Sequence, residues 1–148
     1  MSNVVVVDAS IVLKWVLYEP DSAKAQALLI EWNKKKVATL APALLIYEVT
    51  NTLYRNARKG EITFERAKKA QEEILLAKVA LDFSPDFKLS LRAIELADRF
   101  NLPATYDSHY LALAEREGCE LWTADTRLWN SIKGKLTWVR WMGDYSAS

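Results

Sequence analysis

The one histidine of the chain stands two residues after an aspartate, in the stretch ATYDSHYLAL over residues 104–113. An aspartate and a histidine in contact could act as an acid–base pair in catalysis. The stretch is expected to be helical, and on an ideal helix the side chains of Asp107 and His109 point about 200° apart. We therefore expect His109 to be a surface or packing residue, and Asp107 to work with partners from elsewhere in the chain.

Three aspartates stand where three expected strands end: Asp8 after residues 4–7, Asp107 after residues 102–105, and Asp125 after residues 120–123. In open parallel sheets, ligands bind at the carboxyl ends of the strands. The three carboxylates are therefore candidates for one shared site.

The alternative for each aspartate is a structural role as a helix N-cap, because aspartate is favoured there and each precedes an expected helix. Asp8 fits that alternative least well. Ser10 could cap the helix that follows, and a charged group that ends a strand of four valines is costly to remove from water.

A fourth acid, Glu48, lies inside a helix expected over residues 43–59. At 100° per residue it shares one polar stripe with Asn51, Thr52, Arg55 and Lys59. The opposing apolar face consists of Ile46, Val49, Leu53 and Ala57. The stripe is either part of a site or an ordinary solvated face, and the residues alone leave both open.

Four carboxylates at one sheet edge would repel one another and raise some of their pKa values. A divalent cation removes that conflict. A ligand set rich in oxygen and without histidine favours Mg²⁺ or Mn²⁺ over zinc or copper. A hard cation held by acids can activate water, clamp a phosphate and stabilise a leaving oxygen, so these residues indicate phosphoryl chemistry.

Short apolar runs alternate with amphipathic stretches along the whole chain. The expected strands cover residues 4–7, 37–41, 80–83, 102–105, 120–123 and 136–141. The expected helices cover residues 10–18, 23–36, 43–59, 63–79, 87–100 and 108–117, with Pro42 and Pro85-Asp86 opening two of them and a short helix following Asp125. This alternation predicts one α/β domain over residues 1–148 with a mainly parallel central sheet and a loose end from Tyr145 to Ser148.

The composition is that of a soluble globular protein, with 51% hydrophobic and 26% charged residues among 148. The net charge of +1 gives no overall field that would attract nucleic acid, although a local basic stripe could do so. Cys119 is the one cysteine, which fits a reducing cytoplasm and excludes a zinc site built on cysteines. No leader and no membrane span is expected, and the protein is predicted to be cytosolic.

Four segments of the sequence resemble the PIN domain family, and within it the VapC-type toxins of prokaryotic toxin–antitoxin pairs. They are VVDASIVLKW, APALLIYEVTNTL, ATYDSHYLALAE and LWTADTRL, in the order that the family has. Each motif is weak alone, but together they extend the resemblance from about Val4 to Trp141.

The resemblance implies a three-layer α/β/α sandwich and a metal-dependent endoribonuclease that uses Mg²⁺ or Mn²⁺. The family's acidic metal ligands correspond to Asp8, Glu48, Asp107 and Asp125. Ser10, Asn51 and Thr123 correspond to positions beside those ligands. Such toxins form homodimers and are inhibited by a small cognate antitoxin that fills the groove of the active site.

Substrate binding needs cations, and Lys14, Arg55 and Lys59 are candidates because they extend from the site residues along their helices. An ordinary solvated charge is the alternative for each. The six tryptophans could stack on unpaired bases, but most fall on apolar faces, so we expect core or dimer packing. Ser108 departs from the family, which often has a small apolar residue there, without affecting a ligand.

Two other classes of protein compete with the nuclease. A metal-dependent phosphatase or phosphotransfer domain also collects acids at strand ends, but the first strand lacks the second aspartate two residues after Asp8 that one such class uses. A PIN-like scaffold that binds RNA or protein without catalysis is usually marked by lost acids, and here all four are present.

Overall fold

The computed structural model describes residues 3–83 and 87–147. The described residues contain five strands: β1 (Val4–Val7), β2 (Ala38–Pro42), β3 (Ala80–Asp82), β4 (Glu120–Thr123) and β5 (Val139–Trp141). The α-helices are α1 (Ala9–Val16), α2 (Ser22–Lys34), α3 (Leu44–Arg58), α4 (Phe64–Leu76), α5 (Phe87–Arg99), α6 (Tyr106–Glu117) and α7 (Thr126–Ile132), and a 3₁₀ turn, η1 (Met142–Asp144), follows β5. None of these helices is long and apolar enough to cross a membrane.

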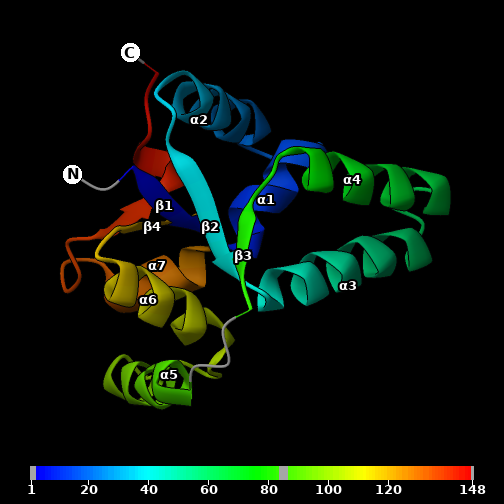
Figure 1. Cartoon of the computed structure of the whole chain (residues 1–148). Helices are drawn as coiled ribbons and strands as arrows, with labels where there is room; N and C mark the ends of the chain where they lie inside the picture. The colour runs from blue at the N-terminus through cyan, green and yellow to red at the C-terminus, as the bar shows by residue number, and fades with distance from the viewer. Residues whose placement is uncertain (1–2, 84–86, 148) are drawn as a thin grey trace.

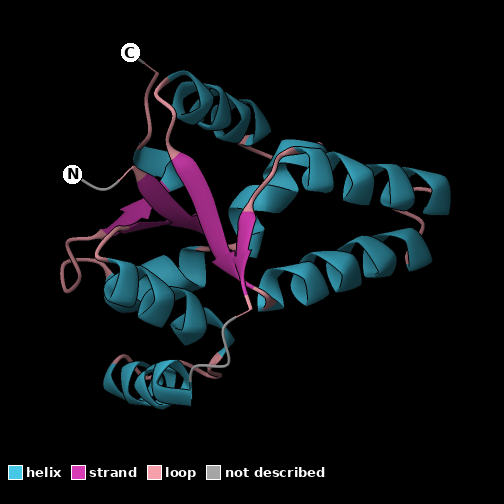
Figure 2. Cartoon of the chain, in the orientation of Figure 1, coloured by secondary structure: helices cyan, strands magenta, loops and turns pink. Residues whose placement is uncertain are grey.

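The five strands form one parallel sheet in the order β3-β2-β1-β4-β5 (Figure 1). Connections from β1 to β2 and from β2 to β3 run toward one edge, whereas the later connections run toward the other. Since crossovers between parallel strands are right-handed, α1–α4 cover one face and α5–α7 cover the other. Figure 2 shows these helical layers on either side of the sheet, so the expected α/β/α sandwich is confirmed.

β1 lies at the centre of the sheet and is covered on both faces, which explains its unbroken run of valines. Val6 pairs with Leu40 on one side and with Leu121 on the other. Ile11 from α1 and Leu111 from α6 are fully buried. This central strand therefore fixes where the site residues that follow it must lie.

The prediction of a strand over residues 102–105 is wrong. Asn101 adopts a left-handed conformation with φ +53°, and the N–H of Leu102 donates to the carbonyl of Ala97 at 2.8 Å. This is the hydrogen bond of a Schellman motif, which ends α5 and uses the N–H that a strand would need. Pro103 has no N–H to offer.

Smaller differences concern the ends of elements. Pro42 is the last residue of β2, not the start of α3, and the final strand is confined to Val139–Trp141. At the end expected to be loose, the ring of Tyr145 packs edge-on against Trp122 with centroids 6.2 Å apart. The expected helix start at residues 85–86 and the end of the chain at residue 148 lie outside the described residues.

The tryptophans pack inside the fold, as expected. Trp15 and Trp32 are at most 8% exposed, and the other four are partly buried. Trp129 and Trp141 stack with centroids 6.1 Å apart, which joins α7 to β5. Ile46, which was expected on the buried face of α3, is 39% exposed instead.

Candidate active site

Two of the four acids lie at the topological switch point, where the connections between strands begin to run toward the other edge of the sheet. β1 and β4 are neighbours, but the chain leaves β1 into α1 on one face and leaves β4 into α7 on the other. Asp8 directly follows β1, and Asp125 stands two residues beyond β4. Such a switch point opens a crevice at the carboxyl ends of the strands, where ligands bind in α/β folds.

Glu48 and Asp107 reach the same edge from helices. α3 begins just after β2, so Glu48, its fifth residue, stays near the carboxyl end of that strand. α6 precedes β4 and runs back along the sheet, which places its N-terminal end, with Asp107 in the first turn, at this edge. Asp107 therefore reaches the edge without the preceding strand that was expected.

The carboxylates influence one another, which shows that they are close. Burial is the main reason why the pKa of Asp107 is raised to about 6, and the charges of Asp125 and Glu48 raise it further while Arg127 lowers it. Burial and then Asp125 also raise the pKa of Glu48, against a hydrogen bond that lowers it. The four acids thus form a single electrostatic cluster.

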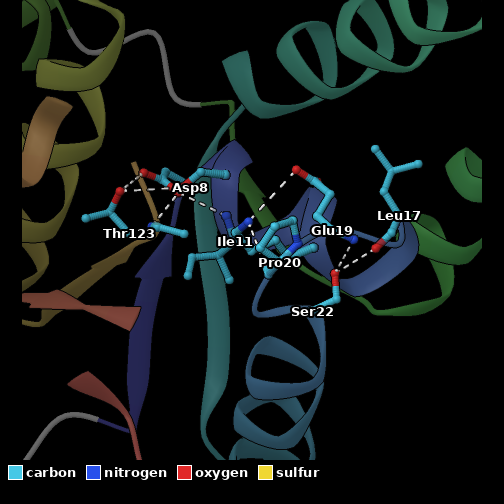
Figure 3. A network of polar contacts seen from close by, with 10 residues as sticks. Asp8, Ile11, Leu17, Glu19, Pro20, Ser22 and Thr123 are labelled. Atoms are coloured by element: carbon cyan, nitrogen blue, oxygen red, sulfur yellow. Dashed lines mark hydrogen bonds and ion pairs between the residues drawn. The ribbon is translucent and has the colours of Figure 1, made fainter. Parts of the chain in front are cut away.

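Asp8 is 4% exposed, and hydrogen bonds reach both of its carboxylate oxygens (Figure 3). Oδ1 accepts from the Ser10 hydroxyl and from the Ile11 N–H at 3.2 Å, and Oδ2 accepts from the Thr123 hydroxyl. Asp8 is therefore also the N-cap of α1, and the expectation that Ser10 would take that role is wrong. Burial outweighs these bonds and raises the pKa of Asp8 to about 7.

Ser10 and Thr123 join the two halves of the switch point. The Ser10 hydroxyl accepts from the Ala124 N–H at 2.8 Å, and the Thr123 hydroxyl accepts from the Asp125 N–H at 3.0 Å. Both hydroxyls donate to Asp8 as well. Two residues with small hydroxyl side chains therefore set the position of Asp8 relative to the backbone of Asp125.

Asp125 caps α7 with one oxygen. Its Oδ1 accepts from the N–H groups of Arg127 at 2.9 Å and Leu128 at 3.2 Å. No described residue donates a hydrogen bond to Oδ2 of this carboxylate. Asp125 can therefore cap α7 through Oδ1 and still offer Oδ2 to a cation.

Tyr110 is a site residue that the sequence did not reveal. Its hydroxyl donates to Oε1 of Glu48 at 2.6 Å, and the side chain is 1% exposed. Burial, Glu48, Asp8 and Asp107 all raise the pKa of Tyr110, so the hydroxyl keeps its proton and remains a donor. The available signal was its spacing, one helical turn after Asp107 on the inward face.

Other candidates lie apart from this cluster. Asn51 is exposed one turn beyond Glu48 and bonds to no other described side chain. The Lys14 ammonium donates to the Pro20 carbonyl at 2.9 Å and lies 3.9 Å from Glu19, so it secures the α1–α2 loop. Arg55 and Lys59 are exposed near the end of α3 that projects away from the sheet (Figure 1).

His109 turns toward α5 and away from the acids. Its Nδ1 lies 2.5 Å from the Thr105 carbonyl oxygen, and its Nε2 lies 3.3 Å from the Ser90 hydroxyl. Ser108 is fully buried and donates to the same Thr105 carbonyl at 3.0 Å. Both residues therefore hold the start of α6 in place, which agrees with a packing role for His109.

The donor set suits a hard cation, but the carboxylates do not enclose one directly. Among the residues that the structure describes, no three His, Cys, Asp or Glu side chains lie close enough together to do so. Mg²⁺ commonly keeps several waters and contacts only one or two carboxylates, so this spacing fits a hydrated ion. Burial is the main reason why the pKa values of Asp8, Glu48 and Asp107 are raised, and repulsion between the acids adds to it; a bound cation would favour their charged forms.

The profile of the PIN domain matches residues 5–134. The chain therefore belongs to the PIN domain family, as the sequence motifs indicated. This membership leaves the phosphatase hypothesis without support.

Two curated relatives come from Pyrobaculum aerophilum. Ribonuclease VapC3 is 33% identical over 137 residues, which cover 89% of this chain and 97% of that protein. Exonuclease VapC9 is 29% identical over 126 residues, which cover 82% and 90%.

Solved structures share the fold. PAE2754 from P. aerophilum matches with a TM-score of 0.66 and 25% identity over 92% of this chain and 91% of that one. A chain of a toxin–antitoxin complex from Klebsiella pneumoniae matches with a TM-score of 0.67 and 17% identity over 93% and 97%. The second likeness concerns the fold alone.

Proposed function

We propose that this protein is a ribonuclease that cuts RNA internally with the help of Mg²⁺ or Mn²⁺. The observation that carries the proposal is the meeting of Asp8, Glu48, Asp107 and Asp125 at one switch point, from four separate parts of the chain. The names of the two relatives support cleavage of nucleic acid: one is named a ribonuclease and the other an exonuclease. Neither name specifies cutting inside an RNA strand. Internal cutting is therefore our own inference.

The four carboxylates would hold the cation, directly or through water. When bound, it supplies a polarised water and positive charge beside the phosphate. Tyr110 donates to one carboxylate oxygen of Glu48, while Ser10 and Thr123 hold Asp8. The protein thus orients the oxygen ligands before RNA arrives, which limits reorganisation during the reaction.

Cleavage of end-labelled single-stranded RNA tests this function. We expect cleavage by the wild-type protein that stops in EDTA and returns with Mg²⁺ or Mn²⁺. Asp107→Asn should lower kcat/KM by about 100-fold or more, as the loss of a group essential to the site does in other enzymes. Asp21→Asn is the matched control, because Asp21 is exposed in the α1–α2 loop and its left-handed φ of +67° suits asparagine.

Cleavage that continues in excess chelator would overturn the metal mechanism. Equal activity of Asp107→Asn and Asp21→Asn would overturn the assignment of the site. A folded wild-type protein that binds RNA and cuts none would favour the non-catalytic scaffold.

We further propose that the protein is the toxin of a toxin–antitoxin pair and acts in the cytoplasm. The VapC names of both curated relatives support this role, together with the motifs that resemble VapC-type toxins. The single, buried cysteine fits a reducing cytoplasm. Induced expression should arrest growth, Asp8→Asn should not, and co-expression of a small protein encoded beside the gene should relieve the arrest.

An apolar groove between α3, α4 and β3 is our candidate surface for the antitoxin. It has a volume of about 330 Å³, and its walls include Leu45, Ile46, Val49, Leu75 and Leu81. Leu75 is 78% exposed, so a large apolar surface is open to solvent here. The groove is formed in part by α3, the helix that also carries Glu48, so a segment bound in it would contact that helix.

We propose a second copy of the chain as the occupant of another apolar surface, on α5. Phe87, Leu91 and Ile94 are 82%, 61% and 58% exposed, and their spacing places them on one stripe of the helix. An exposed apolar stripe on one helix suits pairing with its own copy about a two-fold axis. The homodimer expected from the sequence would form there.

A further inference from the structure

A pocket of about 300 Å³ adjoins the acids on the side of α5–α7. Asp107 and Asp125 form one of its walls. The rest of its lining comes from the loop between α5 and α6 and from α7: Asn101, Leu102, Pro103, Arg127, Leu128 and Ser131. The Schellman motif that ends α5 therefore shapes a hollow directly beside the carboxylates.

The walls of this pocket combine flat apolar surface with polar groups at the edge. Leu102, Pro103 and Leu128 offer apolar contact, whereas the Asn101 amide can donate and accept hydrogen bonds. The Ser131 hydroxyl donates to the Arg127 carbonyl at 3.0 Å and can still accept a hydrogen bond. An unpaired nucleobase has the matching chemistry, with apolar faces and hydrogen-bonding edges. The volume is at the lower end of the range for small-molecule sites, which suits one base.

Cations line the route from the pocket outward. Arg127 is close enough to Asp107 to lower the pKa of that carboxyl. Beyond Asn101, the Arg99 guanidinium lies 4.9 Å and the Lys135 ammonium 6.0 Å from the centroid of the Phe100 ring. Among the described residues, neither Arg99 nor Lys135 has an acid within ion-pair distance, although Arg99 is near enough to Glu115 to lower the pKa of that carboxyl. Both cations could therefore contact phosphates.

We propose that this pocket binds the base of the nucleotide next to the scissile phosphate of single-stranded RNA. Arg99, Arg127 and Lys135 would then contact the phosphates that follow. The inference rests on the proposed ribonuclease function and adds the substrate class and the path of the strand over the surface. It leads the RNA over α5–α7, away from Lys14, Arg55 and Lys59, which were the cations expected from the sequence.

A series of short oligoribonucleotides with one mapped cleavage site tests the pocket. Each member carries a single abasic ribose, at a different position on either side of that site. We expect the wild-type protein to lose about tenfold in kcat/KM when one particular neighbour of the scissile phosphate lacks its base, since stacking and burial of a base have that effect. The other positions should matter less.

Ser131→Phe fills the pocket, and its matched control is Asn130→Phe, a neighbour on α7 that does not line it. Ser131→Phe should cut the intact RNA about tenfold less efficiently and show no further loss with the abasic ribose. Asn130→Phe should follow the wild type. Asn101→Gly removes the amide but accepts the φ of +53°, and it should change the base preferred at the same position.

If the abasic ribose has no effect on wild-type activity at any position, the pocket does not bind a base, while the proposed ribonuclease function still stands. The pocket would equally be overturned if Ser131→Phe kept the wild-type sensitivity or Asn101→Gly kept the wild-type preference. A wild-type protein that cuts none of the series would instead contradict the proposed function.

Discussion

Asp8 is a carboxylate placed where the fold would be more stable without its charge. It follows four valines and is almost fully buried, and its hydrogen bonds only partly offset the loss of water. A functional group often lowers stability in this way. Because burial raises the pKa of Asp8, the stability of the metal-free protein should depend on pH.

In the unfolded chain Asp8 loses its proton near pH 3.8, whereas in the folded protein it keeps the proton to about pH 7. Between these values the folded state binds more protons, so the free energy of unfolding falls as pH rises. We expect the contribution of Asp8 to lower the Tm of metal-free protein by about 5–10 °C between pH 5 and pH 8. The raised pKa of Asp107 acts in the same direction.

Thermal unfolding of wild type and Asp8→Asn in EDTA isolates this effect. The decline between the two pH values should be clearly smaller in the variant, and Mg²⁺ at pH 8 should raise the Tm of the wild type more than that of the variant. Parallel declines in both proteins would mean that Asp8 is ionised at low pH in the fold.

Tyr110→Phe removes a single hydroxyl from beneath Glu48 and keeps the buried ring. We expect a kcat lower by about 10- to 100-fold, the size of such effects beside metal ligands, because Glu48 loses the bond that orients it. KM for RNA should stay unchanged, since the buried hydroxyl does not reach the substrate. The affinity for Mn²⁺, measured by calorimetry, should fall as well.

Tyr18→Phe is the matched control, because Tyr18 is fully exposed and lies in the loop that follows α1. A Tyr110→Phe protein with wild-type kcat and Mn²⁺ affinity would show that the hydroxyl does not position Glu48.

The acids could be anticipated from the sequence, whereas Tyr110 could not. Asp8 and Asp125 are marked by their places after apolar strands, a local pattern. The bond from Tyr110 to Glu48 spans 62 positions of the chain and exists only once α6 faces α3. An aromatic residue on the inward face of a helix otherwise looks like ordinary core.

At the level of elements, the hydrophobic pattern predicted the strands that lie in the sheet and failed at one helix end. Residues 102–105 are apolar enough for a strand, but the left-handed turn at Asn101 commits the N–H of Leu102 to α5. That competition between a helix end and a strand depends on hydrogen bonds that periodicity does not record. The fold class was unaffected because α6 still brings Asp107 to the correct edge.

The exposed stripe of α5 makes a prediction about assembly. Leu91→Arg places a charge in the centre of the proposed interface, so the mass measured by light scattering should fall from that of a dimer to that of a monomer. Leu76→Arg is the matched control, because Leu76 is 74% exposed on α4. A wild-type monomer, or a Leu91→Arg dimer, would contradict the proposed pairing.

At the scale of the whole molecule, the strand order explains how acids so distant in sequence meet. Because connections leave the central strands toward opposite edges, helices lie on both faces and a crevice opens between β1 and β4. α3 and α6 lie on opposite faces of the sheet, and the N-terminal end of each lies at the carboxyl ends of the strands. The topology therefore gathers negative charge at this edge, which the proposed cation would neutralise.

The opening of a closed circular RNA tests internal cleavage at these acids most directly, because a circle has no end for an exonuclease. We expect wild-type protein with Mg²⁺ to convert the circle to linear RNA. Asp107→Asn should leave the circle closed, while Asp21→Asn should behave as wild type. A circle that stays intact under conditions in which linear RNA is degraded, or one that Asp107→Asn opens at the wild-type rate, would contradict the proposed endoribonuclease.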